Sequence, residues 1–304
     1  MEPESPWNDD PHLHPNSTST SPLEYLSTVT DYFSIPLCVA AIVADLFLTV
    51  VILKYKRLKK RTNLYLVNFN ISHILYIIST PLLYYMVSET FYEGQMDIHW
   101  YCVWIRVENF AMGLAFSFIA GYGMDSFLEK AKPSWFSRYK ERYLYVFSFF
   151  YFGHFLVYLI AASICLKRGF NNNFNFHFLS GYFFLALISI LYVTYEEQKL
   201  EKNLRLSTPH KAYSLTVSVI ILLMWMPLII FYNMVIIFAN FENVERVLWY
   251  TLFLPEYLAY CCPMVIIYEL WKSSKQFRNA FRKVLRMAVL DSDFDELNVH
   301  SDDQ

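Results

Sequence analysis

Glycine, charge and cysteine are all scarce in this sequence, and each shortage excludes a class of protein. Only seven of 304 residues are glycine and 17% are charged, whereas 56% are hydrophobic and 19% are aromatic, which is not the balance of an ordinary soluble domain. The net charge of −2 argues against nucleic acid as a general partner. The five cysteines form neither a disulfide framework nor a metal-binding spacing. Residues 1–34 have no basic and no apolar segment, so we expect no cleavable signal peptide.

Long apolar runs are abundant. Each is long enough to cross a bilayer core of ~30 Å as a helix. The runs lie at about 35–56, 63–87, 102–127, 143–165, 176–195, 212–238 and 248–271. We therefore predict an all-α membrane protein, with a seven-transmembrane bundle over residues 35–271 and an extracellular, disordered segment at 1–34. A basic amphipathic stretch at 272–287 predicts a short eighth helix, and an acidic cytoplasmic tail follows at 288–304.

The basic residues indicate how the bundle is oriented. Of the 25 Lys and Arg residues, 21 lie in the segments 54–61, 130–142, 199–211 and 272–286. The positive-inside rule places these segments in the cytosol. We therefore expect a multi-pass protein of the plasma membrane with its N-terminus outside. The sequon at Asn16 agrees, because glycosylation requires the extracellular side.

Two ionisable residues are expected to meet in the middle of the membrane. Asp45 and His73 each lie ~14 Å above the inner end of their helix, so they reach the same depth. Buried ionisable groups are costly and are usually paired or functional, and we predict a polar pair. Metal binding or hydrolysis would need a third ligand at that depth, and His154 is the only other intramembrane histidine. We predict no metal site, no cofactor and no enzymatic activity.

Two acids lie closer to the outer surface. Glu108 and Glu256 are each expected ~10 Å below it, on different helices. Such acids would attract a cationic ligand, either an amine or a basic group of a peptide. A competing interpretation is that one acid pairs with Arg106 or Arg246 and the other is protonated. We expect Glu108 to be the main ligand contact.

Several short motifs occur along the chain in a specific order and spacing. The sixth run contains Trp225-Met226-Pro227, in which the proline frees a backbone carbonyl and permits a kink, and the seventh contains Cys262-Pro263. The further matches are Asn68, Pro81, Trp100, Cys102 and the segment Lys275 to Asn279. Together these motifs resemble the rhodopsin-like G-protein-coupled receptors over roughly residues 35–287, with the last segment similar to the start of that family's eighth helix.

The chain departs from the family where signalling is concerned. Asp125-Ser126-Phe127 stands where the family has Asp-Arg-Tyr, so the arginine that reaches the G protein is replaced by serine. Asp45 aligns with the family's first-helix Asn, and His73 with its sodium-site Asp. These changes bear on G-protein coupling and sodium modulation rather than on the fold. Helix seven has no lysine for a retinal Schiff base.

The resemblance implies a disulfide and a switch. Cys102 resembles the family's third-helix cysteine, and we expect it to bond to Cys165, because both lie at outer helix ends in an oxidising compartment. Ligand binding near Trp225 is expected to shift helices six and seven about Pro227 and Pro263.

The resemblance therefore implies a signalling receptor. The expected partners are an extracellular ligand, the lipid bilayer, and a heterotrimeric G protein or arrestin. Two alternatives stay open. One is a receptor-like protein that does not activate G proteins, acting as a scavenger, an arrestin-biased receptor or a regulator of a partner. The other is a chemoreceptor-type channel or transporter, although the inverted repeats and Gly/Pro-broken helices expected of a transporter are not seen.

Overall fold

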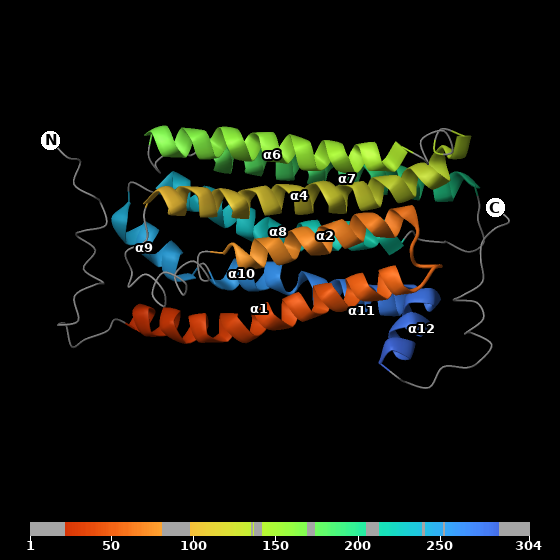
Figure 1. The fold of residues 1–304 in the computed structure, drawn as a ribbon, viewed down its shortest axis with the longest axis horizontal. Coiled ribbons are helices and arrows are strands. Elements are labelled where there is room, and N and C mark those ends of the chain that lie inside the picture. The colour runs from red at the N-terminus through yellow and green to blue at the C-terminus, as the bar shows by residue number, and fades with distance from the viewer. Residues whose placement is uncertain are drawn as a thin grey trace.

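Helices make up nearly all of the chain that the computed structural model describes, which is residues 22–80, 98–134, 136, 142–168, 174–204, 213–238, 241–251 and 253–285. No strand occurs in these ranges. The predicted all-α class is thereby confirmed for the described residues. In chain order (Figure 1) the helices are α1 (Pro22–Lys54), α2 (Arg61–Ile78), α4 (Ile98–Ala131), α6 (Tyr143–Arg168), α7 (Phe174–Leu204), α8 (Tyr213–Phe238), α9 (Glu242–Thr251), α10 (Phe253–Tyr260), α11 (Cys262–Ser273) and α12 (Lys275–Val284).

Within the described ranges, six helical segments are long and apolar enough to cross a membrane. They are Phe33–Lys54, Arg106–Ala131, Tyr143–Lys167, His177–Leu200, Tyr213–Phe238 and Phe253–Ser273. Each overlaps one of the predicted apolar runs. The predicted run 63–87 is described only in its first part, as α2, and Pro81 lies outside the described residues. Helix α1 starts at Pro22 and so extends eleven residues beyond its apolar part.

The surface of the bundle is apolar in the way that a lipid-facing surface requires. On α1 the exposed residues Val39, Val43, Leu46 and Val50 follow a helical repeat and form one stripe, which is the pattern of a single outward face. On α6 only 22% of the most apolar stretch is buried. A soluble helical protein would expose such stripes to water, so they support the membrane assignment.

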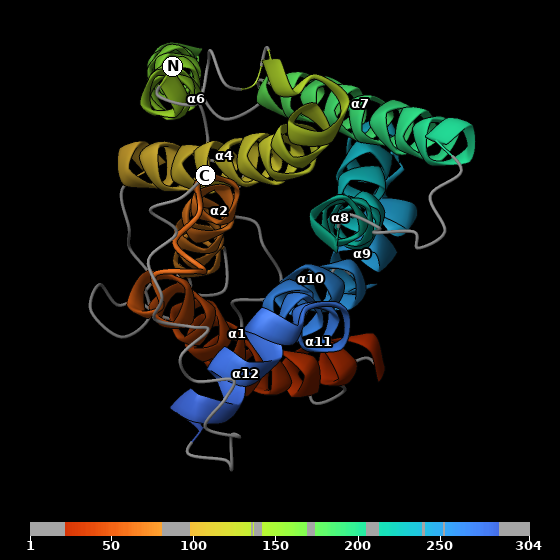
Figure 2. The same ribbon diagram turned by 90° about the vertical axis from the view of Figure 1, so that its right-hand side faces the viewer.

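Helix α4 lies at the centre of the bundle, between α2, α6, α7 and α8 (Figure 2). Its most apolar stretch is 72% buried. Glycines allow the neighbouring helices to come close: a Cβ at Gly113 would lie 2.6 Å from Nδ1 of His154 on α6, and one at Gly121 would lie 2.6 Å from Cε1 of Tyr65 on α2. Both the glycines and the apolar residues of α4 therefore favour its central, buried position.

Proline shapes the last span. Helix α10 ends at Tyr260, Cys261 forms a turn, and α11 begins at Cys262 with Pro263 in its first turn. Because Pro263 has no N–H, the carbonyl of Ala259, four residues earlier, lacks its usual helical donor. This carbonyl becomes an acceptor for another helix.

Candidate functional site

The acid predicted as the main ligand contact lies inside the bundle, in the N-terminal part of α4. Glu108 of α4 is only 3% exposed. Tyr232 of α8 donates a hydrogen bond from its hydroxyl to Oε1 of Glu108, at 3.1 Å. A carboxylate can accept several hydrogen bonds, and among the described side chains Tyr232 is the only donor to Glu108 with a hydrogen bond within 3.5 Å. Glu108 therefore has unused acceptor capacity.

Three tyrosines surround this position together with the second predicted acid. Glu108 and Glu256 both interact electrostatically with the phenols of Tyr76, Tyr232 and Tyr260, which come from α2, α8 and α10. The rings of Tyr76 and Tyr260 are 6.0 Å apart between centroids. Their hydroxyls are buried without a hydrogen-bond partner among the described residues. We call these five residues the acid–tyrosine cluster.

A buried hydroxyl without a partner costs about 1–3 kcal/mol relative to a satisfied group, and the hydroxyls of Tyr55 and Tyr122 are in the same state elsewhere among the described residues. The sequence predicted the two acids but missed the tyrosines. Helical spacing is only a weak signal for them: Tyr260 lies one turn after Glu256, and Tyr76 lies one turn after His73. Tyr232 lies two turns after Trp225 on the same face of α8.

Trp225 lies directly beneath the cluster and is fully buried. Its ring is 4.8 Å from that of Tyr76 and 5.3 Å from that of Phe116, edge to face in the second case. It also meets the imidazole of His73 edge to face at 5.9 Å. Trp225 thus contacts both the acid–tyrosine cluster and the polar pair below it. Pro227 follows two residues later, inside α8.

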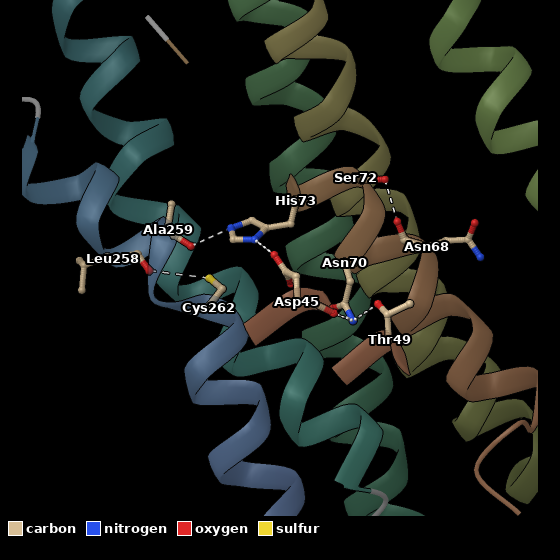
Figure 3. A network of polar contacts seen from close by, with 9 residues as sticks. All are labelled: Asp45, Thr49, Asn68, Asn70, Ser72, His73, Leu258, Ala259 and Cys262. Atoms are coloured by element: carbon tan, nitrogen blue, oxygen red, sulfur yellow. Dashed lines mark hydrogen bonds and ion pairs between the residues drawn. The ribbon is translucent and has the colours of Figure 1, made fainter. Parts of the chain in front are cut away.

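The structure brings Asp45 and His73 together in the core (Figure 3). Nδ1 of His73 lies 2.7 Å from Oδ2 of Asp45, and both side chains are fully buried. Nε2 of His73 lies 3.1 Å from the carbonyl of Ala259, the carbonyl that Pro263 leaves without a helical donor. A carbonyl only accepts, so Nε2 carries a proton, and one further proton is shared between Nδ1 and the carboxyl group of Asp45.

An amide continues this polar layer. Asn70 donates from Nδ2 to Oγ1 of Thr49 at 3.0 Å and to the Asp45 carbonyl at 3.4 Å. Asn68 points the other way, toward α6, and accepts a hydrogen bond from the Tyr151 hydroxyl at 2.8 Å. The layer therefore joins α1, α2 and the α10–α11 turn.

Near the C-terminal end of α4, Asp125 is held by residues of α2. Arg61 donates to both carboxylate oxygens of Asp125, and Thr62 donates from Oγ1 at 2.9 Å. The Arg61 guanidinium also lies 3.9 Å from the centre of the Phe136 ring. Ser126 and Phe127 are half-buried. The partner of Asp125 is therefore an arginine from another helix.

Arg61 was not among the residues predicted to contact Asp125. The two residues lie at a similar depth in the bundle, as Asp45 and His73 do, because Arg61 starts α2 and Asp125 lies near the C-terminal end of α4.

A further polar cluster, also missed, joins α4 to α6 and α7. Oγ of Ser117 lies 2.7 Å from Nε2 of His154 and 2.7 Å from the Tyr182 hydroxyl, and it donates to the Gly113 carbonyl at 3.0 Å. Serine and histidine in contact form the nucleophile and base of hydrolases, but Ser117 is only 2% exposed and its hydrogen bonds are filled. The cluster is structural.

Other predicted residues have more limited descriptions. Cys165 is buried and disulfide-bonded, whereas Cys38, Cys261 and Cys262 are free thiols. The side chains of Cys102 and Arg246 and the sequon at Asn16 lie outside the described residues, so the pairing of Cys102 stays a prediction. Arg106 borders a cavity of about 20 Å³ next to His154. In the described ranges no group of three or more His, Cys, Asp or Glu side chains could hold a metal ion.

The fold and its buried polar layers define a multi-pass helical membrane protein. The chain matches no protein-family model and no curated protein sequence.

Proposed function

We propose that this protein is a seven-helix receptor of the plasma membrane that binds an extracellular ligand in the acid–tyrosine cluster. In this proposal α2 provides the seventh span, and the N-terminus is outside. The observation that carries the proposal is the convergence of two acids and three phenols from four helices, with two hydroxyls left unpartnered. Packing alone does not require such a costly arrangement.

The chemistry of the cluster favours a cationic ligand. An ammonium or guanidinium group would donate to Glu108 and to the tyrosine oxygens, and it would also gain from the faces of the aromatic rings. Both an amine and a basic group of a peptide meet these requirements. Because Glu108 and Tyr76 are buried, such a ligand would have to open the outer half of the bundle.

Contacts below the cluster offer a route for transmission. Trp225 touches Tyr76 above and His73 below, and His73 in turn holds the Ala259 carbonyl in the break made by Pro263. A ligand that moves Trp225 would bias α8 at Pro227 and the α10–α11 turn between two packings. Movement there would change the face that carries Ser126 and the basic connections.

A second candidate function is a receptor-like protein that does not activate G proteins. It is favoured by Ser126 in place of the family's arginine and by the hydrogen bonds that already engage Asp125 with Arg61 and Thr62. Such a protein would act through arrestin, as a scavenger, or by regulating a partner.

The test is a paired readout of G-protein activation and arrestin recruitment in cells, with biogenic amines and Lys/Arg-rich peptides as probes. Glu108→Gln should weaken a cationic probe at least about tenfold, because it removes a charge-assisted contact. Glu269→Gln, on α11 near the opposite end, is the matched control and should respond like the wild type. Surface expression of each variant is measured alongside.

The two functions predict different channels. A G-protein response of the wild type, despite Ser126, supports the first function. Arrestin recruitment or ligand uptake with no G-protein response supports the second function, provided that Ser126→Arg gives the chain a G-protein response. A probe response that Glu108→Gln leaves unchanged would remove the cluster as the binding site.

A further inference from the structure

One end of the bundle carries a dense basic surface formed by two segments that are far apart in the chain. Residues 54–61 and 272–285 hold eleven Lys and Arg residues and no acidic residue. Helix α1 ends at Lys54, and α12 follows directly on α11, so both segments lie at the same end, the right-hand end in Figure 1. With no carboxylate among them, their charges add to a strongly positive local potential.

The two segments are in contact. The ring of Phe281 on α12 lies 5.5 Å from that of Phe47 on α1, and Nζ of Lys283 lies 5.8 Å from the centre of the Tyr55 ring. The Lys59 N–H donates to the Tyr55 carbonyl at 3.1 Å, which fixes the turn. The basic residues of the turn are therefore held beside those of α12.

The apolar face of α12 is already covered by protein. Phe277, Ala280 and Phe281 are buried. Phe281 stacks on Trp271 of α11 at 6.2 Å, and Phe277 meets Tyr213 of α8 edge to face at 6.1 Å. An interfacial helix normally binds a membrane by burying its apolar face in the lipid. The apolar face of α12 packs against the bundle instead, so α12 can interact with a lipid leaflet mainly through its basic residues.

Some of the basic residues also take part in the packing of the fold. Arg278 donates from Nε and Nη2 to the carbonyls of Trp271 and Lys272, at 2.9 and 3.0 Å, and so caps the end of α11. Arg61 is bound to Asp125. The exposed members, which we call the basic patch, are Lys54, Lys56, Lys59, Lys60, Lys272, Lys275 and Arg282.

The patch begins where the lipid-facing surface of α1 ends. Val50 and Leu53 are exposed apolar residues on α1, and Lys54 follows at once. The patch therefore lies at the depth of lipid headgroups if the helices cross a bilayer. A basic cluster next to a membrane helix is a site for anionic lipids.

We propose that the basic patch binds the phosphorylated headgroup of an anionic lipid in the cytosolic leaflet and thereby fixes α12 against the membrane. This role does not depend on whether the chain signals. It requires only that this end of the bundle faces the cytosol. The acidic segment 288–304 could bind the basic patch instead of a lipid. Binding of this segment would not require the patch to lie next to the lipid-facing surface of α1, whereas binding of a lipid headgroup does.

The experiment measures lipid binding to the purified full-length chain by native mass spectrometry. The probes are phosphatidylinositol 4,5-bisphosphate, phosphatidylserine, phosphatidylcholine and soluble inositol trisphosphate. The patch variant carries Lys59→Gln, Lys60→Gln and Arg282→Gln. The control variant carries Lys132→Gln, Lys199→Gln and Lys202→Gln, which removes equal charge from exposed positions in other basic segments.

We expect the wild type and the control to bind both anionic lipids better than phosphatidylcholine. The patch variant should lose about fivefold per charge, or about a hundredfold in all, at unchanged thermal stability. Equal losses in both variants, or none in the patch variant, would overturn the proposal. The proposal would also be overturned if soluble inositol trisphosphate bound as tightly as the lipid. The same holds if lipid bound only after residues 288–304 were removed, because the acidic tail would then be the occupant of the basic patch.

Discussion

Three carboxyl groups of the bundle are held by different numbers of donors, and this decides what each can do. Asp125 receives hydrogen bonds from Arg61 and Thr62, so its charge is well compensated. Asp45 shares a proton with His73. Glu108 has one long contact, from Tyr232. A buried carboxylate with unused acceptor capacity is the one that a new donor would stabilise most, which is why the proposed ligand is placed at Glu108.

Removing His73 should destabilise the bundle. In His73→Ala, Asp45 loses its partner and the Ala259 carbonyl loses its donor, and removal of one member of a buried pair costs about 3–5 kcal/mol. The check is thermal unfolding in detergent micelles. The double variant Asp45→Ala/His73→Ala should recover part of the loss, because no charge stays buried. If the single variant unfolds at the wild-type temperature, the pair contributes nothing to stability.

Among the elements, α4 has the strictest packing, and its glycines set the distance to its neighbours. Nδ1 of His154 lies so close to Gly113 that a methyl group would displace the imidazole, and with it the hydrogen bond from His154 to Ser117. The absence of a side chain at Gly113 therefore allows His154 to reach Ser117 and form this hydrogen bond.

Gly113→Ala should cost about 1–3 kcal/mol of stability, the usual penalty for overpacking a core. Gly153→Ala on α6 is the matched control, because no neighbouring atom lies within 4 Å of a Cβ built there. That variant should be neutral or more stable, by up to about 1 kcal/mol, since alanine favours a helix. Thermal unfolding of the two variants side by side measures the difference. Equal behaviour would mean that α6 can move away from α4 freely.

The link between α2 and α4 can be tested by charge exchange. Arg61→Asp leaves two acids facing each other and should destabilise the inner end, and so should Asp125→Arg. The double variant restores an opposite pair, and its stability should exceed the sum of the single effects by about 1–3 kcal/mol. A strictly additive double-mutant cycle would show that the Arg61–Asp125 contact has no energetic weight.

Helix positions could be predicted from the sequence because apolar runs are long and unambiguous, whereas contacts between helices could be predicted only where depth restricts them. Asp45 and His73 share a depth, and so do Arg61 and Asp125, but only the first pair was recognised. Pro263 indicates a free carbonyl at Ala259, yet nothing in the sequence identifies His73 as its donor. Tyr76 and Tyr260 could not be singled out from the 24 tyrosines, because most aromatic residues in a membrane bundle serve packing.

At the scale of the whole molecule, the number of spans decides which sides of the membrane the two ends occupy. Six spans place the N- and C-termini on the same side, and seven place them on opposite sides. The described part of α2 packs between α1 and α4 (Figure 2). It therefore runs through the depth of the bundle, and we expect it to complete a seventh crossing.

Epitope tags at the two termini test this parity directly. In intact cells an N-terminal tag should be stained and a C-terminal tag only after permeabilisation, and an endoglycosidase should shift the mobility of the wild type but not of Asn16→Gln. Both termini staining alike would show an even number of spans and remove α2 as a crossing. An N-terminal tag reached only after permeabilisation would reverse the bundle, and the acid–tyrosine cluster would then face the cytosol. The cationic extracellular ligand and the cytosolic-leaflet lipid proposed for the opposite end would then both be untenable, because the two proposals depend on the same orientation.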